Sequence, residues 1–480
     1  MRAAFGSFCI AFAGLALSAC VSTDVGPINT HVAEVGRPSA EYIPDPAGDG
    51  STVIGLAISG GGTRAAAFGY GVLRGLDEIV VGRGPKRRML TDDIRMISGT
   101  SGGAVTAAYF GLKGRDYVDL RERFLLADAE KELHKSELSP ANWVRIYNGG
   151  ANDRSTFADW LNRNVFDGKT YASFQRKHAP IVWINASDIY NATPFAFTYD
   201  TFAALCSDLD KVRIADAVAA SAAFPVVFAP IVVSTTTPRT KCGYQRPEWL
   251  TRALADPAAS IRLKAYARAL DTYQSNDNVD YIKLLDGGLT DNIGVTGFSL
   301  EREAAKSAHG PLSAEEAVKL RTFVFIVADA SIRTEGDWVQ TKSGPKFPQM
   351  VGAISNASIR SSVRDEFDAL RLAVEVWRNK LVAWRCGLPS ETVRRYRGTL
   401  AGWNCRDVDL VVEDVSFDDF PQPERGKLNA IPTRLKLPRE QVDLLISAGS
   451  QSLHDNVILR DAFDRIQRRA GIDPLSASLQ

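Results

Sequence analysis

The chain has few histidines and almost no net charge. The 480 residues include only 5 histidines, namely His31, His134, His178, His309 and His454. None of them lies in a recognisable elbow, turn or strand-end motif. The formal net charge is +1 at pH 7, which gives no reason to expect nucleic acid as a partner. The hydrophobic content of 45% is ordinary for a globular protein, and the chain is long enough for one large domain or two.

Metal-ligand spacings, internal repeats and long apolar runs are missing as well. No spacing of cysteines resembles a zinc site, and we predict neither a metal nor another cofactor. The apolar N-terminal run, residues 3–16, is too short for a comfortable membrane span.

That N-terminal run ends in a short motif that predicts processing. The tetrapeptide Leu17-Ser18-Ala19-Cys20 resembles a bacterial lipobox, in which the cysteine is acylated and becomes the new N-terminus. We therefore predict a lipoprotein signal peptide over residues 1–20 and membrane anchoring through acylated Cys20; the alternative is a plain secretory signal. Val21, instead of aspartate, follows the cysteine, which resembles the sorting pattern for an outer-membrane lipoprotein facing the periplasm or the cell surface.

Export would permit disulfides. Once Cys9 and Cys20 are set aside, four cysteines remain, namely Cys206, Cys242, Cys386 and Cys405. Four cysteines allow three pairings. The pairs with the shortest loops are Cys206–Cys242 and Cys386–Cys405, which we predict, with free buried thiols as the alternative.

Alternating apolar runs predict an α/β fold after a polar tether over residues 21–50. Strands are expected at residues 52–59, 94–97, 181–186, 282–285 and 323–328, with helices of small residues at 65–76, 104–109 and 214–223. Gly69 and Gly71 disfavour a helix by about 1 kcal/mol each, so close packing is expected at both. This alternation predicts a mostly parallel sheet between layers of helices.

The remaining segments predict further helices and strands. The strongly charged residues 115–138 are typical of a helix, residues 195–198 of a hairpin strand, and residues 248–273 of a helical insertion. Apolar residues between 359 and 384 recur every three or four positions, which predicts a long helix packed on the sheet or, alternatively, facing a membrane. A late strand at 407–417 and closing helices at 438–466 complete the pattern.

Glycine-rich turns follow three of the predicted strands. Gly99-Thr100-Ser101-Gly102-Gly103 has the Gly-x-Ser-x-Gly pattern, in which glycines permit a sharp turn from strand to helix that exposes the serine hydroxyl. Gly60-Gly61-Gly62 can direct backbone N–H groups at an oxyanion, and it lacks the Gly-Lys-Ser/Thr of a phosphate loop. Asp286-Gly287-Gly288 places a carboxylate at a strand end. Because ligands bind at the carboxyl ends of strands in open α/β sheets, the three turns together predict an acyl-transfer site.

These motifs resemble the patatin-like phospholipase family. The family carries Gly-Gly-Gly-x-Arg, seen here up to Arg64, then the serine elbow, an alanine-rich block similar to residues 219–225, and Asp-Gly-Gly followed by an asparagine similar to Asn292. Gly294 departs from the pattern, because many members have proline nearby. The resemblance covers residues 52–330 and implies a three-layer catalytic domain over 51–330, with 331–480 as a helical C-terminal extension packed on it.

The resemblance implies a catalytic dyad, with Ser101 as the nucleophile and Asp286 as its general base. Oxyanion donors would be Gly60, Gly61 and Gly62. Supporting residues would be Arg64, Gly99, Gly103, Gly287 and Gly288, with Arg64 either holding the glycine loop or meeting an anionic head group. The implied function is a phospholipase A-type hydrolase of membrane lipids that needs no metal. Alternatives are a serine hydrolase that uses His178 or His309, an enzyme for thioesters or peptides, and a non-catalytic lipid-binding or scaffolding lipoprotein.

Overall fold

A computed structural model describes most of the chain. The described residues are 26–35, 48–134, 139–147, 149–235, 242–275, 278–333, 337–340 and 342–472. The predicted signal peptide over residues 1–20, with Cys20, lies outside these ranges. Within them, no helix combines the length and the apolar character that crossing a membrane requires.

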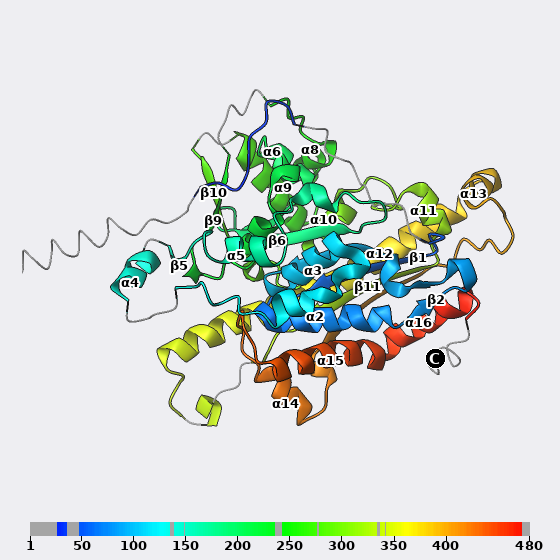
Figure 1. Cartoon of the computed structure of the whole chain (residues 1–480). Coiled ribbons are helices and arrows are strands. Elements are labelled where there is room, and N and C mark those ends of the chain that lie inside the picture. The colour runs from blue at the N-terminus through cyan, green and yellow to red at the C-terminus, as the bar shows by residue number, and fades with distance from the viewer. Residues whose placement is uncertain are drawn as a thin grey trace, which may run out of the picture.

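A mixed sheet of eight strands forms the centre of the molecule, in the order β12-β11-β1-β4-β6-β10-β9, with β7 paired to β6 (Figure 1). The strands are β1 Thr52–Ile58, β4 Ile94–Thr100, β6 Ile181–Asp188, β7 Thr193–Ala196, β9 Ile231–Ser234, β10 Tyr281–Asp286, β11 Thr322–Asp329 and β12 Asp409–Ser416. From β12 to β6 all neighbours are parallel, whereas β10 runs antiparallel to both β6 and β9. The predicted hairpin of β6 and β7 is confirmed.

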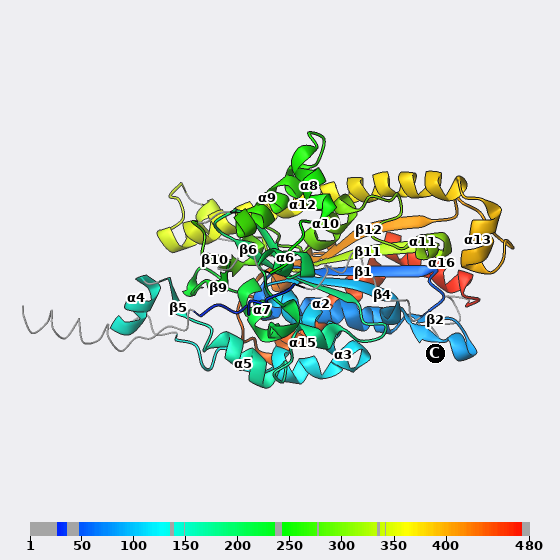
Figure 2. The same cartoon turned by 90° about the horizontal axis from the view of Figure 1, so that it is seen from above.

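Helices cover both faces of this sheet, so the predicted three-layer α/β fold is confirmed (Figure 2). One face carries α2 Gly62–Asp77, α3 Gly102–Lys113, α7 Ile214–Ser221, α15 Arg439–Asp455 and α16 Val457–Arg469. The other carries α10 Thr296–Ala304, α11 Ala314–Lys319 and α12 Phe347–Cys386. Shorter elements are β2 Val80–Val81, β3 Arg88–Met89, β5 Gly150–Asn152, β8 Val226–Phe228, α4 Pro140–Tyr147, α5 Phe157–Asn164, α6 Tyr199–Ala204, α13 Ser390–Arg397 and α14 Glu424–Asn429.

The continuous apolar run of β1 follows from its burial on both faces. Leu56 and Ile58 belong to the core under α2 and α3, whereas Val53 and Ala57 belong to the core under α12. Successive side chains of a strand point to opposite faces, so a strand covered on both sides needs apolar residues throughout.

Glycines allow α2 to pack closely on its neighbours. A Cβ atom at Gly69 would lie 2.5 Å from Ile58 of the sheet, which confirms the close packing expected there. At Gly71 the neighbour is instead the backbone carbonyl of Ile446 in α15, and Gly449 of α15 in turn faces the carbonyl of Phe68. The two helices therefore cross with their backbones in contact.

The long helix α12 covers the second face of the sheet. Its residues Leu370, Val374, Trp377 and Leu381 are buried in the core there. The Trp377 ring lies edge-on to Phe323 of β11, with 5.2 Å between ring centroids. The apolar stripe thus packs on the sheet, as the first of the two predicted alternatives states.

Two predicted helices differ in the structure. The described part of residues 115–138 contains a 3₁₀ segment, Gly114–Asp119, and a single π turn, Arg121–Leu125. Gly114, with φ +59°, ends α3, and the wide π turn buries both Phe124 and Leu125. The insertion at 248–273 forms two helices, α8 Glu248–Ala255 and α9 Ile261–Ser275, which are separated at Pro257.

Both predicted disulfides are present. The Cα–Cα distances are 5.6 Å for Cys206–Cys242 and 4.9 Å for Cys386–Cys405.

Residues 26–35 contact the region of the Cys206–Cys242 disulfide and strand β9. This arrangement differs from the flexible tether that the sequence predicted over residues 21–50. The amide of Val32 donates to the carbonyl of Cys206, and buried Asn29 bonds to Ser207 and to the backbone of Ser234.

Residues beyond 330 contribute to the same sheet and to both helical layers. They supply strand β12, which pairs in parallel with β11, as well as α12, α15 and α16. The division into a catalytic domain over 51–330 and an extension over 331–480 stays a prediction.

Candidate active site

Ser101 lies at a sharp turn between β4 and α3. Its backbone has φ 53° and ψ −122°, a left-handed φ that is uncommon outside glycine. Glycines on either side allow the turn, because a Cβ at Gly99 would lie 2.5 Å from the carbonyl oxygen of Gly103 and one at Gly103 would collide with the carbonyl of Ile58. The Gly-x-Ser-x-Gly pattern thus reflects backbone contacts at both ends of the turn.

The structure brings Ser101 and Asp286 together across 185 positions of the chain. The hydroxyl Oγ of Ser101 donates to Oδ2 of Asp286 at 2.7 Å. Ser101 directly follows β4 and Asp286 ends β10, and the two strands flank β6 in the sheet. Only 9% of Ser101 and 8% of Asp286 are exposed, so the pair lies in a largely dry position.

Hydrogen bonds hold both the carboxyl and the backbone of Asp286 at the end of β10. Its Oδ1 accepts from the amide of Gly288 at 2.8 Å, and its own amide donates to the carbonyl of Ala223 at 2.9 Å. Burial raises the pKa of Asp286 to about 6, and the hydrogen bonds from Ser101 and Gly288 only partly oppose this shift. A Cβ at Gly287 would collide with the carbonyl of Asn185 in β6, which explains the glycine there.

Ser221 fixes the backbone of the serine turn, a role that sequence reasoning missed. Its hydroxyl accepts from the amide of Ser101 at 2.8 Å and donates to the carbonyl of Asn185 at 2.5 Å. Ser221 is fully buried at the end of α7. It lies within the alanine-rich block noted in the sequence, and this block was the available signal.

The glycine loop between β1 and α2 offers fewer oxyanion donors than predicted. The amide of Gly60 donates to the carbonyl of Asn292 at 2.9 Å and is therefore occupied. Among the described residues, no acceptor bonds to the amides of Gly61, Gly62 and Gly102. Gly102 directly follows Ser101 at the start of α3, so it is a further candidate donor that the sequence analysis did not name.

Arg64 supports the glycine loop and does not face the dyad. The guanidinium is buried against Gly61 and donates to the carbonyls of Ala330 and Ile431 at 3.0 and 2.9 Å. Burial lowers the pKa of Arg64 to about 10. Of the two roles that the resemblance implied, the contacts favour holding the loop over meeting an anionic head group.

A late segment of the chain also contacts the glycine loop. The carbonyl of Arg434 accepts from the amide of Thr63 at 2.8 Å, and a Cβ at Gly62 would lie 2.6 Å from the same oxygen. The Arg434 side chain pairs with buried Glu130, whose Oε1 accepts from Nε at 2.9 Å. Glu130 also accepts from the amide of Leu435, so this segment is held firmly.

The two histidines considered as alternative bases lie away from Ser101. His178 is exposed just before the start of β6, and His309 precedes α11 and the start of β11. Since β4, β6 and β11 point the same way, both histidines lie toward the edge of the sheet opposite the end of β4. Nδ1 of His309 lies 2.7 Å from the carbonyl oxygen of Leu312.

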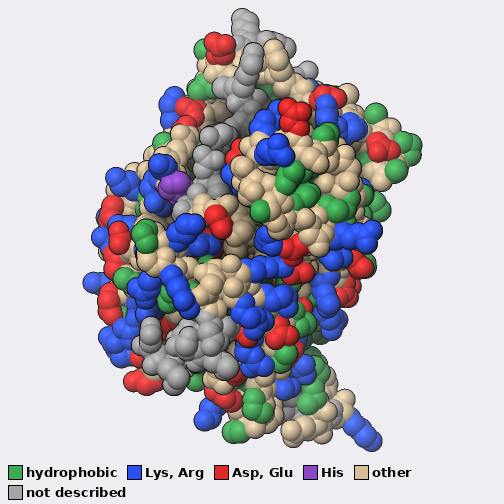
Figure 3. All heavy atoms as spheres, turned by 90° about the vertical axis from the view of Figure 1, so that its right-hand side faces the viewer, with side chains coloured by type: hydrophobic (Ala, Val, Ile, Leu, Met, Phe, Trp, Pro, Cys, Tyr) green, Lys and Arg blue, Asp and Glu red, His purple; other side chains and the backbone are tan. Residues whose placement is uncertain are grey.

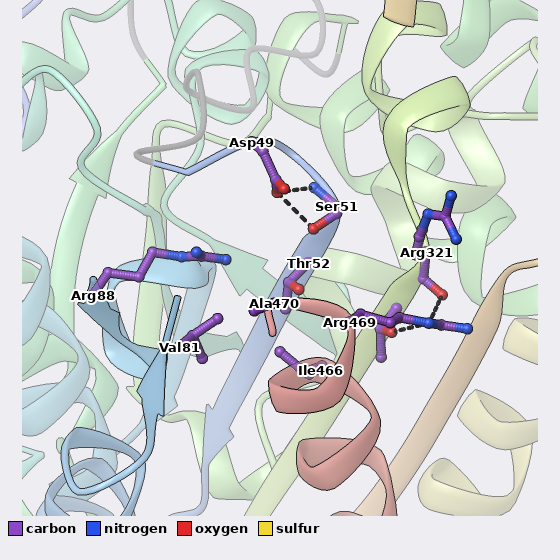
Figure 4. A pocket seen from close by; sticks show the side chains of 10 residues that line it. Asp49, Ser51, Thr52, Val81, Arg88, Arg321, Ile466, Arg469 and Ala470 are labelled. Carbon is purple, nitrogen blue, oxygen red and sulfur yellow. Dashed lines mark hydrogen bonds between the residues drawn. The ribbon is translucent and has the colours of Figure 1, made fainter. Parts of the chain in front are cut away.

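A small cavity of about 40 Å³ lies at that opposite edge (Figure 4). Thr52 and Thr322, at the starts of β1 and β11, line it together with Arg88, Arg321 and Arg469. These arginines pair with nearby carboxylates, such as Asp93 for Arg88. Since the cavity lies at the starts of β1 and β11, it does not belong to the serine site after the end of β4. Across the described ranges, no group of three or more His, Cys, Asp or Glu side chains is placed to hold a metal ion.

Comparison with known proteins gives one family match. A model described as patatin-like phospholipase matches residues 56–299, which is about half of the chain. No curated protein matches the sequence.

Similar solved structures include the two chains that follow. Human GIVD cytosolic phospholipase A2 has a TM-score of 0.39 and 14% identity, with 88% of this chain and 63% of that chain covered. VipD from Legionella pneumophila has a TM-score of 0.32 and 13% identity, with 94% and 72% covered. The chain therefore spans less than two thirds of the human protein with which it was compared.

Proposed function

Since the chain belongs to the patatin-like phospholipase family of lipid hydrolases, we propose that it cleaves acyl esters of membrane lipids through Ser101 and Asp286. One observation carries this proposal, namely the 2.7 Å hydrogen bond from the Ser101 hydroxyl to the Asp286 carboxylate. The nucleophile and its base thus already lie at the distance that proton transfer requires.

The reaction proceeds in two steps. Asp286 accepts the Ser101 proton while Oγ attacks the ester carbonyl carbon, and the resulting oxyanion lies against backbone amides. The carbon–oxygen bond to the alcohol then breaks, and Asp286 returns the proton to the leaving oxygen. In the second step Asp286 takes a proton from water, the hydroxide attacks the acyl-enzyme, and the fatty acid leaves as Ser101 regains its proton.

The amides of Gly61, Gly62 and Gly102 are the proposed oxyanion donors, because they have no acceptor among the described residues. Loss of one such donor typically raises the barrier by about 3 kcal/mol. Backbone donors cannot be removed by replacing side chains, but any Cβ at Gly102 would collide with the carbonyl of Gly62 and displace the loop.

The raised pKa makes Asp286 a better base than an ordinary aspartate. A carboxylate with a pKa of about 6 is still mostly deprotonated at pH 7 and accepts a proton more readily than one with a pKa near 4. Burial thus partly compensates for the absence of a histidine.

Export and anchoring through acylated Cys20 remain part of the proposal. An anchor of more than one acyl chain would hold the enzyme firmly at a membrane that contains its substrate. Residues 1–20 lie outside the described part, so this point depends on the sequence motif alone.

Labelling with a fluorophosphonate probe, combined with mass spectrometry of lipid products, tests the proposal. We expect wild type to be labelled and to release fatty acid from phospholipids, whereas Ser101→Ala is neither labelled nor active. Ser155→Ala is the matched control, because Ser155 is exposed and bonds only near its own turn. Labelling that persists in Ser101→Ala would contradict the proposal, and a folded wild type without label or turnover would support the lipid-binding alternative.

A further inference from the structure

We propose that an exposed apolar rim beside the active site inserts into the surface of a lipid bilayer and presents Ser101 to it. The rim consists of Trp143, Tyr147, Phe224, Val226, Val227 and Leu289. This inference rests on the proposed lipid hydrolase function and adds the part of the molecule that meets the membrane.

All six side chains are strongly exposed. The exposed fraction is 63% for Trp143 and 92% for Tyr147, and it lies between 41% and 60% for the other four. Single exposed apolar residues are common on protein surfaces, whereas a group beside one site indicates an interaction surface.

Two residues of the rim, Phe224 and Leu289, adjoin the dyad, and strands β8 and β5 link them to the rest. Phe224 follows Ala223, whose carbonyl accepts from the amide of Asp286, and Leu289 lies three positions after Asp286. Val226 pairs with Gly150 where β8 joins β5. Helix α4, which carries Trp143 and Tyr147, leads directly into β5, and both views place α4 at one end of the molecule (Figures 1 and 2).

Backbone contacts hold the rim outward. Val226 has φ +72°, which is a strained conformation for a β-branched residue. The neighbouring strand end is fixed by Asn152, whose Nδ2 donates to the carbonyl of Val227 at 3.0 Å and whose own carbonyl accepts from the amide of Ala229 at 2.7 Å. The strained backbone at Val226 leaves an apolar side chain exposed to water. Strain of this kind is often found at functional sites, which favours a functional reason for the exposure.

The chemistry of the rim fits a bilayer interface. Tryptophan and tyrosine combine an apolar ring with a polar group and are enriched where hydrocarbon meets head groups. The dyad is almost fully buried, so an ester within a bilayer reaches it only if the enzyme is held close to that bilayer, whereas a water-soluble ester can diffuse to it.

The end of the molecule opposite to α4 is rich in charge. The face that carries α13 and the end of α16 shows many Lys and Arg side chains interspersed with Asp and Glu (Figure 3). Arg394, Arg395 and Arg468 belong to these helices. Insertion at the rim directs the site toward the membrane and leaves this charged face away from it.

The test uses the full chain with Cys20→Ser in every sample, so that no acyl anchor contributes. Trp143→Ser/Tyr147→Ser is compared with the control Ile261→Ser/Val457→Ser, which removes two exposed apolar residues elsewhere. We measure binding to phosphatidylcholine vesicles by sedimentation, turnover on the same vesicles, and hydrolysis of a water-soluble short-chain ester.

Burying two aromatic rings in the bilayer surface corresponds to at least about a tenfold change in affinity for vesicles. We expect the rim variant to bind vesicles and turn them over at least about tenfold less well, with ester hydrolysis unchanged and the control like wild type. Quenching of wild-type tryptophan fluorescence by brominated phosphatidylcholine, reduced in Trp143→Phe, is expected independently of whether the serine variant folds.

Equal vesicle binding by the rim variant and wild type would overturn the proposal. So would a change of oligomeric state instead of vesicle binding, because the rim would then be a protein interface. If wild type binds vesicles through the rim but hydrolyses neither substrate, the proposed function fails while the surface stands.

Discussion

Replacing Asp286 by asparagine should abolish hydrolysis and at the same time stabilise the folded protein. The carboxyl is buried, and its pKa in the folded state is about 6, compared with an ordinary value of 3.8. Between these two values the folded state holds a proton that the unfolded state has lost. The free energy of unfolding therefore falls as the pH rises through this window.

The size of the effect follows from the shift. Each pKa unit corresponds to 1.36 kcal/mol, so a shift of about two units makes the wild type about 3 kcal/mol less stable at pH 8 than the same chain with a neutral side chain at this position. Asparagine is neutral at every pH, has the shape of aspartate, and can still accept from the amide of Gly288 and face Ser101. The variant should gain about 3 kcal/mol at pH 8 and almost nothing at about pH 4.

Urea unfolding at both pH values, followed by tryptophan fluorescence and circular dichroism, measures this difference. Asp418→Asn is the control, because Arg333 and Arg360 lower the pKa of Asp418 and the sign is reversed; this variant should lose stability at pH 8. Equal stability of Asp286→Asn and wild type at both pH values would refute the reasoning that burial raises the pKa of the base.

Three further predictions concern pH dependence, the histidines and a disulfide. The kcat on a water-soluble ester should rise with pH, with a midpoint of about 6, and level off above it, because Asp286 must be deprotonated to act as a base; a pH-rate profile without a midpoint near this value would contradict this role. His178→Ala and His309→Ala should each keep kcat within about twofold of wild type in the same assay, and loss of turnover in either would restore a histidine-dependent mechanism. Cys386→Ser/Cys405→Ser should lower the free energy of unfolding by about 3 kcal/mol in urea titrations while ester hydrolysis at 25 °C is unchanged, because the disulfide closes a loop of 19 positions away from Ser101; equal stability would show that the bond does not constrain the unfolded chain.

The sequence predicts those parts of the site that depend on local backbone geometry. A serine at φ 53° needs glycines around it, so the turn at Ser101 is visible as a motif. Strands such as β1 and β11 are visible because burial on both faces demands continuous apolar runs. The pairing of Ser101 with Asp286 does not follow from strand ends alone, because β10 runs antiparallel to β6; the register that places Asp286 opposite Ala186 brings the two residues together.

Long-range backbone contacts leave no such trace. Arg434 contributes its carbonyl to the glycine loop, and any residue could supply that oxygen. Residues 26–35 have a polar composition typical of a tether, yet Asn29 bonds with Ser207 and Ser234, which no local pattern predicts. Likewise, charge suggested a helix over 115–138, whereas the described part contains a 3₁₀ segment and a single π turn, for which the charge pattern gives no signal.

The contact between the glycine loop and Arg434 makes the order of synthesis matter. A nascent chain that has not yet reached this residue already contains Ser101 and Asp286, but its loop lacks the carbonyl that binds Thr63 and the helix α15 that crosses α2. The proposed oxyanion donors are therefore aligned only after residues 434–455 have been made and have folded back. Incomplete or C-terminally clipped copies should remain inert toward the lipids of the cell that makes them.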